Sequence, residues 1–237
     1  ENIALGIIWL CVGVIELFIA LLKHSKEKKS KNKIVLEKGT KFELSLYDSV
    51  EDIEEDADKW TTSNKKIVKV KNGVLTPVGV GSAKVTAKFN GKKYTCKVTV
   101  VDYTGMSIEQ KKVISYALKY VGNKYRYGGT SLTKGADCSG FTLAVYKKFG
   151  YKLTHNAYSQ IGDTKTVKMK NIKPGDLIFY GSSKRSCSHV ALYIGNGKVV
   201  HASTERTGIV VSDYKYRKYV AVVAEHVSEY HILERFL

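Results

Sequence analysis

The chain begins with an apolar segment that is long enough to cross a lipid bilayer. Residues 3–22 contain one charged side chain, Glu16. At about 1.5 Å rise per residue, a helix of this length extends about 30 Å, the thickness of a membrane's hydrocarbon core. We therefore expect a transmembrane helix or signal anchor over residues 1–23. A cleaved signal peptide is the alternative, although 20 residues are long for its apolar part.

A Lys-rich linker over residues 24–33 follows this span. It holds five lysines and one glutamate, a net charge of +4. Positive residues beside a span usually stay in the cytoplasm, and this rule taken alone would keep the C-terminal part inside the cell. Large folded domains are nevertheless often exported despite such local charge. The orientation of the chain therefore has to be judged from the chemistry that follows.

Alternation of apolar and polar residues with period two predicts a small all-β domain over residues 34–102. The dipeptides Asn90-Gly91 and Asn72-Gly73 are two-residue hairpin signals within it. Short strands at this spacing predict a small antiparallel sandwich, with Cys96 on its inward face. Two runs of alternating apolar residues show the pattern most clearly: Ala83, Val85, Ala87 and Phe89, and then Tyr94, Cys96, Val98 and Val100.

The pattern changes to a helical period in the last domain. Ser107 with Gln110 forms a capping-box signature at the start of a first predicted helix. Apolar residues at helical spacing from Phe141 onwards predict a second helix, with Cys138 at or just before its N-terminus. The positive end of a helix dipole favours a thiolate, and free N–H groups in the first turn can hold an oxyanion. This placement predicts a nucleophilic cysteine, and the alternative is a buried structural thiol.

A cysteine nucleophile needs a general base. Of the six histidines, His189 and His201 lie on two predicted strands that are joined by the turn Asn196-Gly197. In a regular hairpin closed by this turn, His189 pairs with Thr204 and His201 pairs with Leu192, so that the two imidazoles fall on opposite faces. A bulge or a bent strand is needed to bring them together.

Five short motifs occur in this domain: Tyr125 with Gly128-Gly129, Asp137-Cys138-Ser139-Gly140-Phe141, Pro174-Gly175-Asp176-Leu177, His189 to Gly195, and His201-Ala202-Ser203. In this order they resemble the NlpC family of bacterial cell-wall cysteine peptidases, over about residues 107–226. The resemblance implies an α+β papain-like fold, in which a helix carrying the cysteine packs on an antiparallel sheet carrying the histidines. Family members cleave the peptidoglycan stem peptide, typically between γ-D-glutamate and diaminopimelate or lysine.

The resemblance implies a role for each matching residue. Cys138 is the expected nucleophile, His189 the base that takes its proton, and His201 the third residue that holds the imidazole in the useful tautomer. No metal ion or cofactor is expected. The chain departs from the family at residues 153–156, where many members carry Pro or Arg, so its substrate preference stays open. Three further residues match positions beside the substrate or the oxyanion: Tyr125, Asp137 and Ser139.

The middle domain also resembles a known module. Residues 60–64, 68–70, 73–75 and 83–87 resemble the bacterial immunoglobulin-like module of surface proteins. That resemblance implies an extracytoplasmic spacer or adhesive domain. The expected fold class is therefore multi-domain: a transmembrane helix, a small all-β immunoglobulin-like sandwich over residues 34–102, and an α+β papain-like domain with an antiparallel sheet over residues 103–237.

The chain is strongly basic, with 39 Lys and Arg against 22 Asp and Glu, a net charge of +17. Residues 103–237 contribute +12 of this, from 21 basic and 9 acidic side chains. Such a charge favours nucleic acid, anionic lipid or an anionic polymer as partner. The sequence has no stacking-aromatic platform or zinc finger for nucleic acid. Its four cysteines also lack the spacing of a disulfide framework or metal site.

These features favour a membrane-anchored peptidoglycan hydrolase, a thiol protease that cleaves an amide bond of the stem peptide by a Cys/His/His mechanism. The expected partners are the stem peptide, an anionic cell-wall polymer, and the membrane through the N-terminal helix. One alternative is an amidase or acyltransferase on the same scaffold, and another is a non-enzymatic adhesion protein that binds the wall. We expect the catalytic domain to be extracytoplasmic at the cell membrane, or secreted if the N-terminal helix is cleaved.

Overall fold

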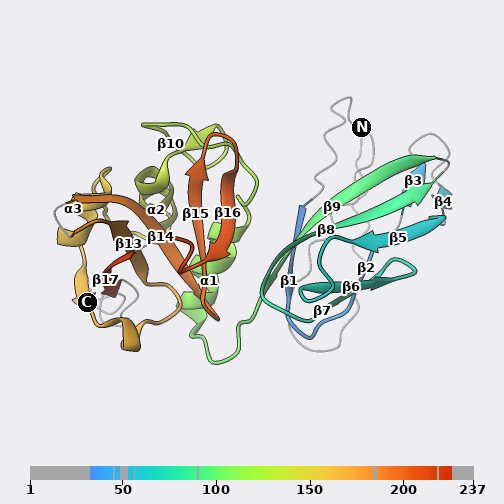
Figure 1. Ribbon diagram of the computed structural model, residues 1–237, viewed down its shortest axis with the longest axis horizontal. Coiled ribbons are helices and arrows are strands. Elements are labelled where there is room, and N and C mark those ends of the chain that lie inside the picture. Colours follow the sequence, from blue (N-terminus) through green and yellow to red (C-terminus); the bar gives the residue numbers. More distant parts are fainter. Residues whose placement is uncertain are drawn as a thin grey trace, which may run out of the picture. The chain divides into compact units, whose positions relative to one another are not determined.

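The structure is a computed structural model that describes residues 33–44, 46–48, 53–55, 57–89, 91–183, 186–217 and 219–225. The predicted transmembrane helix, and all but the last residue of the predicted linker, lie outside these residues. Within the described part, no helix is long and apolar enough to span a bilayer. Figure 1 shows an all-β domain followed in sequence by a domain of helices and strands.

The all-β domain contains a four-stranded sheet of order β1-β9-β8-β5, a three-stranded sheet of order β2-β7-β6, and the pair β3-β4. Its strands are β1 (Lys33–Glu37), β2 (Phe42–Glu43), β3 (Leu46–Asp48), β4 (Ile53–Glu55), β5 (Lys59–Thr62), β6 (Val68–Lys71), β7 (Val74–Pro77), β8 (Gly81–Phe89) and β9 (Lys92–Val101).

One apolar core joins the two larger sheets of this domain and makes it a sandwich. The alternation predicted for β8 is confirmed, because its alternate residues from Gly81 to Ala87 are buried. Cys96 is half-buried against the core, and burial raises its pKa to about 11, so it is a structural thiol. The fully buried members of the core are Leu36, Ala83, Val85, Val98 and Val100 from the larger sheet and Val68 and Leu75 from the smaller one.

Both predicted hairpins of the sandwich are confirmed. Lys71 pairs with Val74, and the turn between them has φ values of 46° at Asn72 and 76° at Gly73, as a tight hairpin turn requires. Strands β8 and β9 pair from Phe89 to Lys92 across the second predicted turn.

The antiparallel prediction fails at one edge of the sandwich. Strand β1 runs parallel to β9, with Lys33 opposite Lys97 and Glu37 opposite Val101. A parallel pair needs a long crossover connection, and here the rest of the domain supplies it. Period-two alternation reports which face a residue occupies and carries no information about strand direction, so the sequence pattern could not reveal this pairing.

The second domain has a six-stranded sheet of order β12-β17-β13-β14-β15-β16. Every neighbouring pair in that sheet is antiparallel, which confirms the α+β prediction. The elements are α1 (Ile108–Leu118), β10 (Thr130–Ser131), β11 (Gly135–Ala136), α2 (Cys138–Lys147), α3 (Ala157–Gly162), β12 (Lys165–Val167), the 3₁₀ turn η1 (Met169–Asn171), β13 (Leu177–Gly181), β14 (Cys187–Gly195), β15 (Lys198–Thr204), β16 (Gly208–Asp213) and β17 (Tyr219–Glu225).

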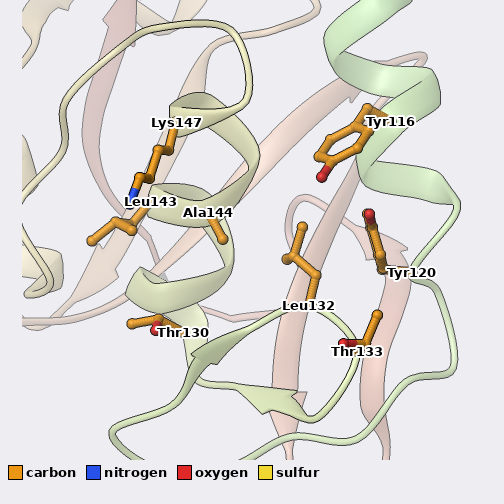
Figure 2. Close-up of a pocket in the computed structure, with 8 residues that line it drawn as sticks. All are labelled: Tyr116, Tyr120, Thr130, Leu132, Thr133, Leu143, Ala144 and Lys147. Atoms are coloured by element: carbon orange, nitrogen blue, oxygen red, sulfur yellow. The ribbon is translucent and has the colours of Figure 1, made fainter.

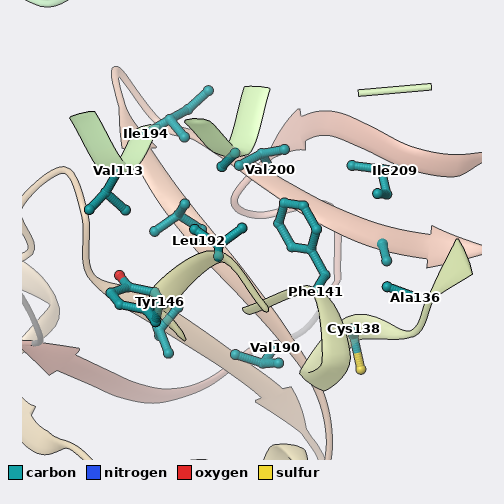
Figure 3. Packing of buried hydrophobic residues seen from close by; sticks show 14 of the residues in the cluster. Val113, Ala136, Cys138, Phe141, Tyr146, Val190, Leu192, Ile194, Val200 and Ile209 are labelled. Atoms are coloured by element: carbon teal, nitrogen blue, oxygen red, sulfur yellow. The ribbon is translucent and has the colours of Figure 1, made fainter. Parts of the chain in front are cut away.

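Helices α1 and α2 lie side by side, and Figure 2 shows Tyr116 of α1 directed toward α2. The predicted capping box starts α1, because Ser107 and Gln110 exchange hydrogen bonds between side chain and backbone. Figure 3 shows how apolar side chains of α2 pack on the sheet. This core includes Val113, Ile114, Ala117 and Leu118 from α1, Phe141 and Val145 from α2, and Leu177, Phe179, Val190, Leu192 and Val200 from the strands.

The opposite face of the central strands is covered as well. A second cluster there contains Ile178, Tyr180, Ala191 and Val199. Because successive strand residues point to opposite faces, β14 contributes Val190 and Leu192 to the helix side and Ala191 to the other side. The central strands are therefore buried on both faces, and polar side chains on either face have to find partners inside the protein.

Candidate active site

Cys138 is the first residue of α2, where the sequence predicts it. The carboxylate of Asp137 caps this helix by accepting a hydrogen bond of 2.7 Å from the Gly140 N–H. It also accepts bonds from the Gly128 N–H at 3.0 Å and from the Ser139 hydroxyl at 3.1 Å. A network of local hydrogen bonds thus fixes the helix terminus that carries the thiol.

A close backbone approach explains the glycine two residues after Cys138. A Cβ atom on Gly140 would overlap the carbonyl oxygen of Gly129 and would also crowd the imidazole of His155. Only glycine lets the first turn of α2 lie this close to the loop that contains Gly129. The buried side chain of Gln160 ties α3 to α2 through a 2.9 Å hydrogen bond to the Ser139 carbonyl.

Burial controls the charge of the thiol. The Cys138 side chain lies in the core cluster with 9% of its surface exposed, and burial raises the pKa of its thiol. The N–H groups of Val190 and Ser139 act in the opposite direction but do not outweigh it. The N–H groups of the first turn do lower the thiol pKa, but desolvation of the charged form is the larger effect, so the pKa is raised overall.

A bulge in β14 brings the two predicted histidines onto one face. Gly195 pairs with Lys198, but the register then shifts, so that Tyr193 pairs with Val199. Ile194 is the extra residue, and Gly195 has a φ of 85°, which glycine adopts without strain. Since side chains alternate, the shift moves His201 from the face of Leu192 to the face of Tyr193 and His189.

The bulge places His189 and His201 in direct contact. His189 Nε2 lies 2.8 Å from His201 Nδ1, and the rings meet edge to face with centroids 5.0 Å apart. Both side chains are buried. Burial, and then the charge of His201, lower the pKa of His189 to about 3, while burial and Arg217 lower the pKa of His201 to about 4. Both imidazoles are therefore neutral near pH 7.

Two residues that sequence analysis missed complete this network. The Ser212 hydroxyl lies 3.0 Å from His201 Nε2, and the Tyr216 hydroxyl lies 3.3 Å from His201 Nδ1. The Tyr216 ring also packs on His201, with centroids 4.7 Å apart. No local pattern marks either residue, because Ser212 reaches the site through the pairing of β16 with β15 and Tyr216 through the turn that follows β16.

The network allows an arrangement of protons that leaves His189 with a free base nitrogen. If Ser212 accepts from Nε2 of His201, then the lone pair on Nδ1 of His201 can accept from Nε2 of His189 at 2.8 Å, with the Tyr216 hydroxyl at 3.3 Å as the weaker partner. Nδ1 of His189 then carries no proton and can act as a base. In the described part of the chain, the Cys138 thiol is not hydrogen-bonded to either imidazole. It lies beside the N–H of Val190, the residue that follows His189, and such contacts often tighten only when substrate binds.

The other predicted site residues surround the thiol. Burial, and then the charges that Cys138 and Asp137 carry when ionised, raise the pKa of the Tyr125 hydroxyl. Asp137 and Ser139 are buried and bonded to each other at the start of α2, so their predicted contact with substrate stays a prediction. His155 lies with Nε2 3.1 Å from both carboxylate oxygens of Asp137. Its segment is the one that departs from the family pattern, and that departure was its only signal.

No group of three or more His, Cys, Asp or Glu side chains that could hold a metal ion occurs among the described residues. The Cys187 thiol donates a 3.5 Å hydrogen bond to the carbonyl of His189, and burial raises its pKa. It is a free thiol, as are Cys96 and Cys138.

Comparison with known proteins agrees with this geometry. Residues 122–227 match the model of the NlpC/P60 family, so this part of the chain carries an NlpC/P60 domain. The chain is 36% identical over 110 residues to the Gamma-DL-glutamyl hydrolase of Bacillus subtilis, covering 45% of this chain and 26% of that protein. It is 38% identical over 106 residues to the Murein DD-endopeptidase MepS/Murein LD-carboxypeptidase of Escherichia coli, covering 44% of this chain and 54% of that protein.

Among solved structures, the chain is similar to the peptidoglycan hydrolase RipB from Mycobacterium tuberculosis, with 29% identity and a TM-score of 0.46 over 50% of this chain and 65% of that chain. The chain spans between about a quarter and about half of the length of the two curated relatives.

The proton arrangement of the His189–His201 pair, the dyad, can be tested directly. We expect His201 to carry its proton on Nε2, and we expect Ser212→Ala or Tyr216→Phe to mix the two tautomers because each removes a partner that favours this one. Imidazole ¹⁵N chemical shifts measure the tautomer. Ser182→Ala, an exposed serine of the same domain, is the control. A wild-type His201 protonated on Nδ1 would contradict the arrangement.

The buried dyad should also make stability depend on pH. Unfolding releases imidazoles with an ordinary pKa near 6.5, whereas the folded pKa values are about 3 and 4. The unfolded state therefore binds more protons, and stability falls as pH decreases from 6.5, by up to about 1.4 kcal/mol per imidazole and pH unit. Urea denaturation between pH 7 and 4.5 measures this loss. The slope should be shallower in His189→Asn/His201→Asn, and an equally steep slope would contradict burial of neutral imidazoles.

Proposed function

We propose that the last domain is a cysteine peptidase that hydrolyses an amide bond in the stem peptide of peptidoglycan. The observation that carries this proposal is the His189–His201 contact, which the β14 bulge makes possible. The thiol of Cys138 lies beside the N–H of Val190, the residue that follows His189. A buried thiol and a buried pair of imidazoles are costly to maintain, and nucleophilic catalysis explains why the domain has them. The NlpC/P60 match over the same residues supports the proposal.

The geometry supports a two-step reaction. As Sγ of Cys138 attacks the amide carbonyl, Nδ1 of His189 takes the thiol proton, and a tetrahedral intermediate forms. His189 then gives this proton to the leaving amine, and an acyl thioester of Cys138 results. Water attacks the thioester with His189 as base, which releases a carboxylic acid and restores the thiol. Because both groups are neutral at rest, proton transfer accompanies the attack rather than preceding it.

Charge that develops on the substrate oxygen needs donors already in place. The N–H groups of Ser139 and Cys138 in the first turn of α2, and that of Val190 on β14, all point toward the thiol region, since each lowers the thiol pKa. They can serve as an oxyanion hole, with the hydroxyl of Tyr125 as a further donor. His201 does not touch substrate in this scheme and acts by orienting His189.

We propose that the bond cleaved is the one between γ-D-glutamate and diaminopimelate or lysine. The name of the Bacillus subtilis relative agrees with a γ-glutamyl bond, whereas the name of the Escherichia coli relative describes DD-endopeptidase and LD-carboxypeptidase activities. The loop at residues 153–156, which contains His155, is where we expect the preference to be set. An amidase or acyltransferase on the same scaffold would use the same three residues, and only product analysis separates these activities. An intact dyad argues against a purely adhesive protein.

We further propose that residues 1–23 anchor the chain in a membrane and that the sandwich is an immunoglobulin-like spacer between that anchor and the catalytic domain. The stem peptide lies outside the cytoplasmic membrane, so the catalytic domain has to be extracytoplasmic, or secreted if the N-terminal segment is cleaved. The charge of +12 over residues 103–237 would hold the enzyme on an anionic wall polymer, and this attraction should weaken with salt.

Digestion of purified muropeptides tests the activity. We expect the wild-type chain to create one new amine and one new carboxyl group within the stem peptide, and mass spectrometry identifies the bond. Cys138→Ala should lower the rate by at least about 10³-fold, because it removes the nucleophile. Cys187→Ala removes another half-buried thiol of the same domain and should leave the rate unchanged. Cleavage by Cys138→Ala at the wild-type rate would refute the mechanism, and a product without new termini in the peptide would refute the substrate.

Protease treatment of intact cells tests the location. An extracytoplasmic catalytic domain should be degraded by protease added outside while a cytoplasmic marker protein survives, because the membrane shields only the inner compartment. A catalytic domain that survives until the cells are lysed would contradict the proposal.

A further inference from the structure

The outer face of α1 carries lysines near its start and at its C-terminal cap. Residues facing the core from this helix are apolar, while Lys111 and Lys112 are exposed near its start and Lys119 is exposed at the cap, about two helical turns further on. They line a hollow of about 440 Å³ together with Lys148 and the ring of Phe149, which follow α2. Its remaining lining residues are Ile108, Ser115 and Tyr116.

A second hollow of about 320 Å³ neighbours the first, and Tyr116 lines both. Figure 2 shows it between α1 and α2, with the hydroxyl groups of Tyr116 and Tyr120 directed toward each other and Lys147 on the opposite wall. Leu143 and Ala144 supply apolar surface from α2. The lining is completed by Thr130, Leu132 and Thr133.

The charged side chains that line these two hollows are all positive. No carboxylate lines either of them. Within the described residues, none of their five lysines forms an ion pair, whereas Lys198 pairs with Asp213 and Lys38 pairs with Asp102 elsewhere. We call these two neighbouring hollows together the trough. The five ammonium groups around it create a positive potential that an extended anion can neutralise.

We propose that this trough, defined by Lys111, Lys112, Lys119, Lys147 and Lys148, binds a linear polyanion made of polyols joined by phosphodiesters. The ammonium groups can pair with the phosphates, and the Tyr and Thr hydroxyls can bond to the polyol oxygens. The inference rests on the proposed function in one respect, namely that a cell-wall enzyme meets such a polymer. It specifies where on the domain the polymer docks.

The lysines of the trough lie away from the candidate active site. Cys138 is the first residue of α2 and Lys147 is the last. At about 1.5 Å rise per residue, they are separated by about 13 Å along the helix axis. Thr130, which also lines the second hollow, pairs with Ala136 near Cys138. A polymer held by the lysines therefore docks at the end of α2 opposite the thiol.

The shape of the surface favours a polymer over a membrane. A helix that binds a bilayer presents protruding apolar side chains, but here only Ile108, with 66% of its surface exposed, protrudes from the lining. The aromatic rings are instead held against one another, with Tyr116 5.2 Å from Tyr120 and 5.7 Å from Phe149 between centroids. A concave surface with fixed rings fits a chain that lies in it.

The test uses the full chain with Cys138→Ala, so that binding is measured without hydrolysis. Labelled poly(glycerol phosphate) is titrated at low and at physiological salt, and fluorescence anisotropy reports the dissociation constant. Glutamine at Lys111, Lys112, Lys119, Lys147 and Lys148 should raise that constant by about tenfold or more, because each change removes a Coulombic contact. The matched control has glutamine at five exposed lysines of the same domain, and its constant should change by less than about threefold. The control positions are Lys152, Lys165, Lys168, Lys170 and Lys173.

A second variant separates the hollow from the charge. Thr133→Trp fills the hollow between α1 and α2 at unchanged net charge and should also weaken binding. Circular dichroism checks that each variant is folded. Equal losses in the two glutamine variants would overturn the proposal, because total charge would then explain binding. Unchanged binding by Thr133→Trp, or equal binding of poly-γ-glutamate, would overturn the fit to a polyol phosphate.

The last measurement compares binding to vesicles of phosphatidylglycerol with binding to the polymer. Tighter binding to vesicles than to the polymer, through the same five lysines, would replace the polymer by a membrane and overturn the proposal. Hydrolysis of soluble muropeptides by the glutamine variant with Cys138 intact is measured separately and should equal that of the parent. Failure of the parent in that assay would refute the proposed function, whereas failure of polymer binding refutes only the docking trough.

Discussion

The hydrogen bond between His189 and His201 depends on one extra residue in β14, and the rest of the candidate site depends on that bond. In a regular hairpin, His201 would share a face with Leu192 and point toward the helices. The bulge at Ile194 moves it to the other face, where Nδ1 meets Nε2 of His189 at 2.8 Å. Ile194 itself stays buried in the core on the helix side, so the hydrophobic packing of the sheet and the polar pair on its other face are both satisfied.

Burial gives the site its electrostatic character. It raises the pKa of the Cys138 thiol and lowers those of both imidazoles, and each shift favours the neutral form. A site of this kind holds no fixed ion pair at rest. Charge would appear only as a substrate reacts, where backbone N–H groups already aimed at the thiol can stabilise it without reorganising. Such donors stabilise the developing charge more than they stabilise the neutral resting site.

Helix α2 links two regions of different chemistry. Its N-terminus is fixed by Asp137 and by the close approach of Gly140 to Gly129, which sets the position of the thiol. Its C-terminus carries Lys147 beside the exposed face of α1. Because one rigid helix joins them, a polymer bound at one end would fix the distance at which the thiol at the other end is presented to the wall.

Much of the fold follows from the sequence by local rules. Alternation predicted the strands of the sandwich, the Asn-Gly pairs predicted their turns, and Ser107 with Gln110 predicted the start of α1. These features depend on neighbours in sequence, and the structure has them where the pattern indicates. The parallel pairing of β1 with β9 was beyond such rules, because it joins the two ends of the domain and alternation carries no direction.

The candidate site divides in the same way. The sequence by itself determined that Cys138 lies at a helix N-terminus and that His189 and His201 lie on adjacent strands, because capping, helical periodicity and a two-residue turn are local. Only the tertiary structure decided that the imidazoles share a face, that Ser212 and Tyr216 reach His201, and that the thiol is neutral. Each of these depends on a register shift, a strand pairing or a degree of burial, and such quantities are set by packing between segments that are distant in the chain.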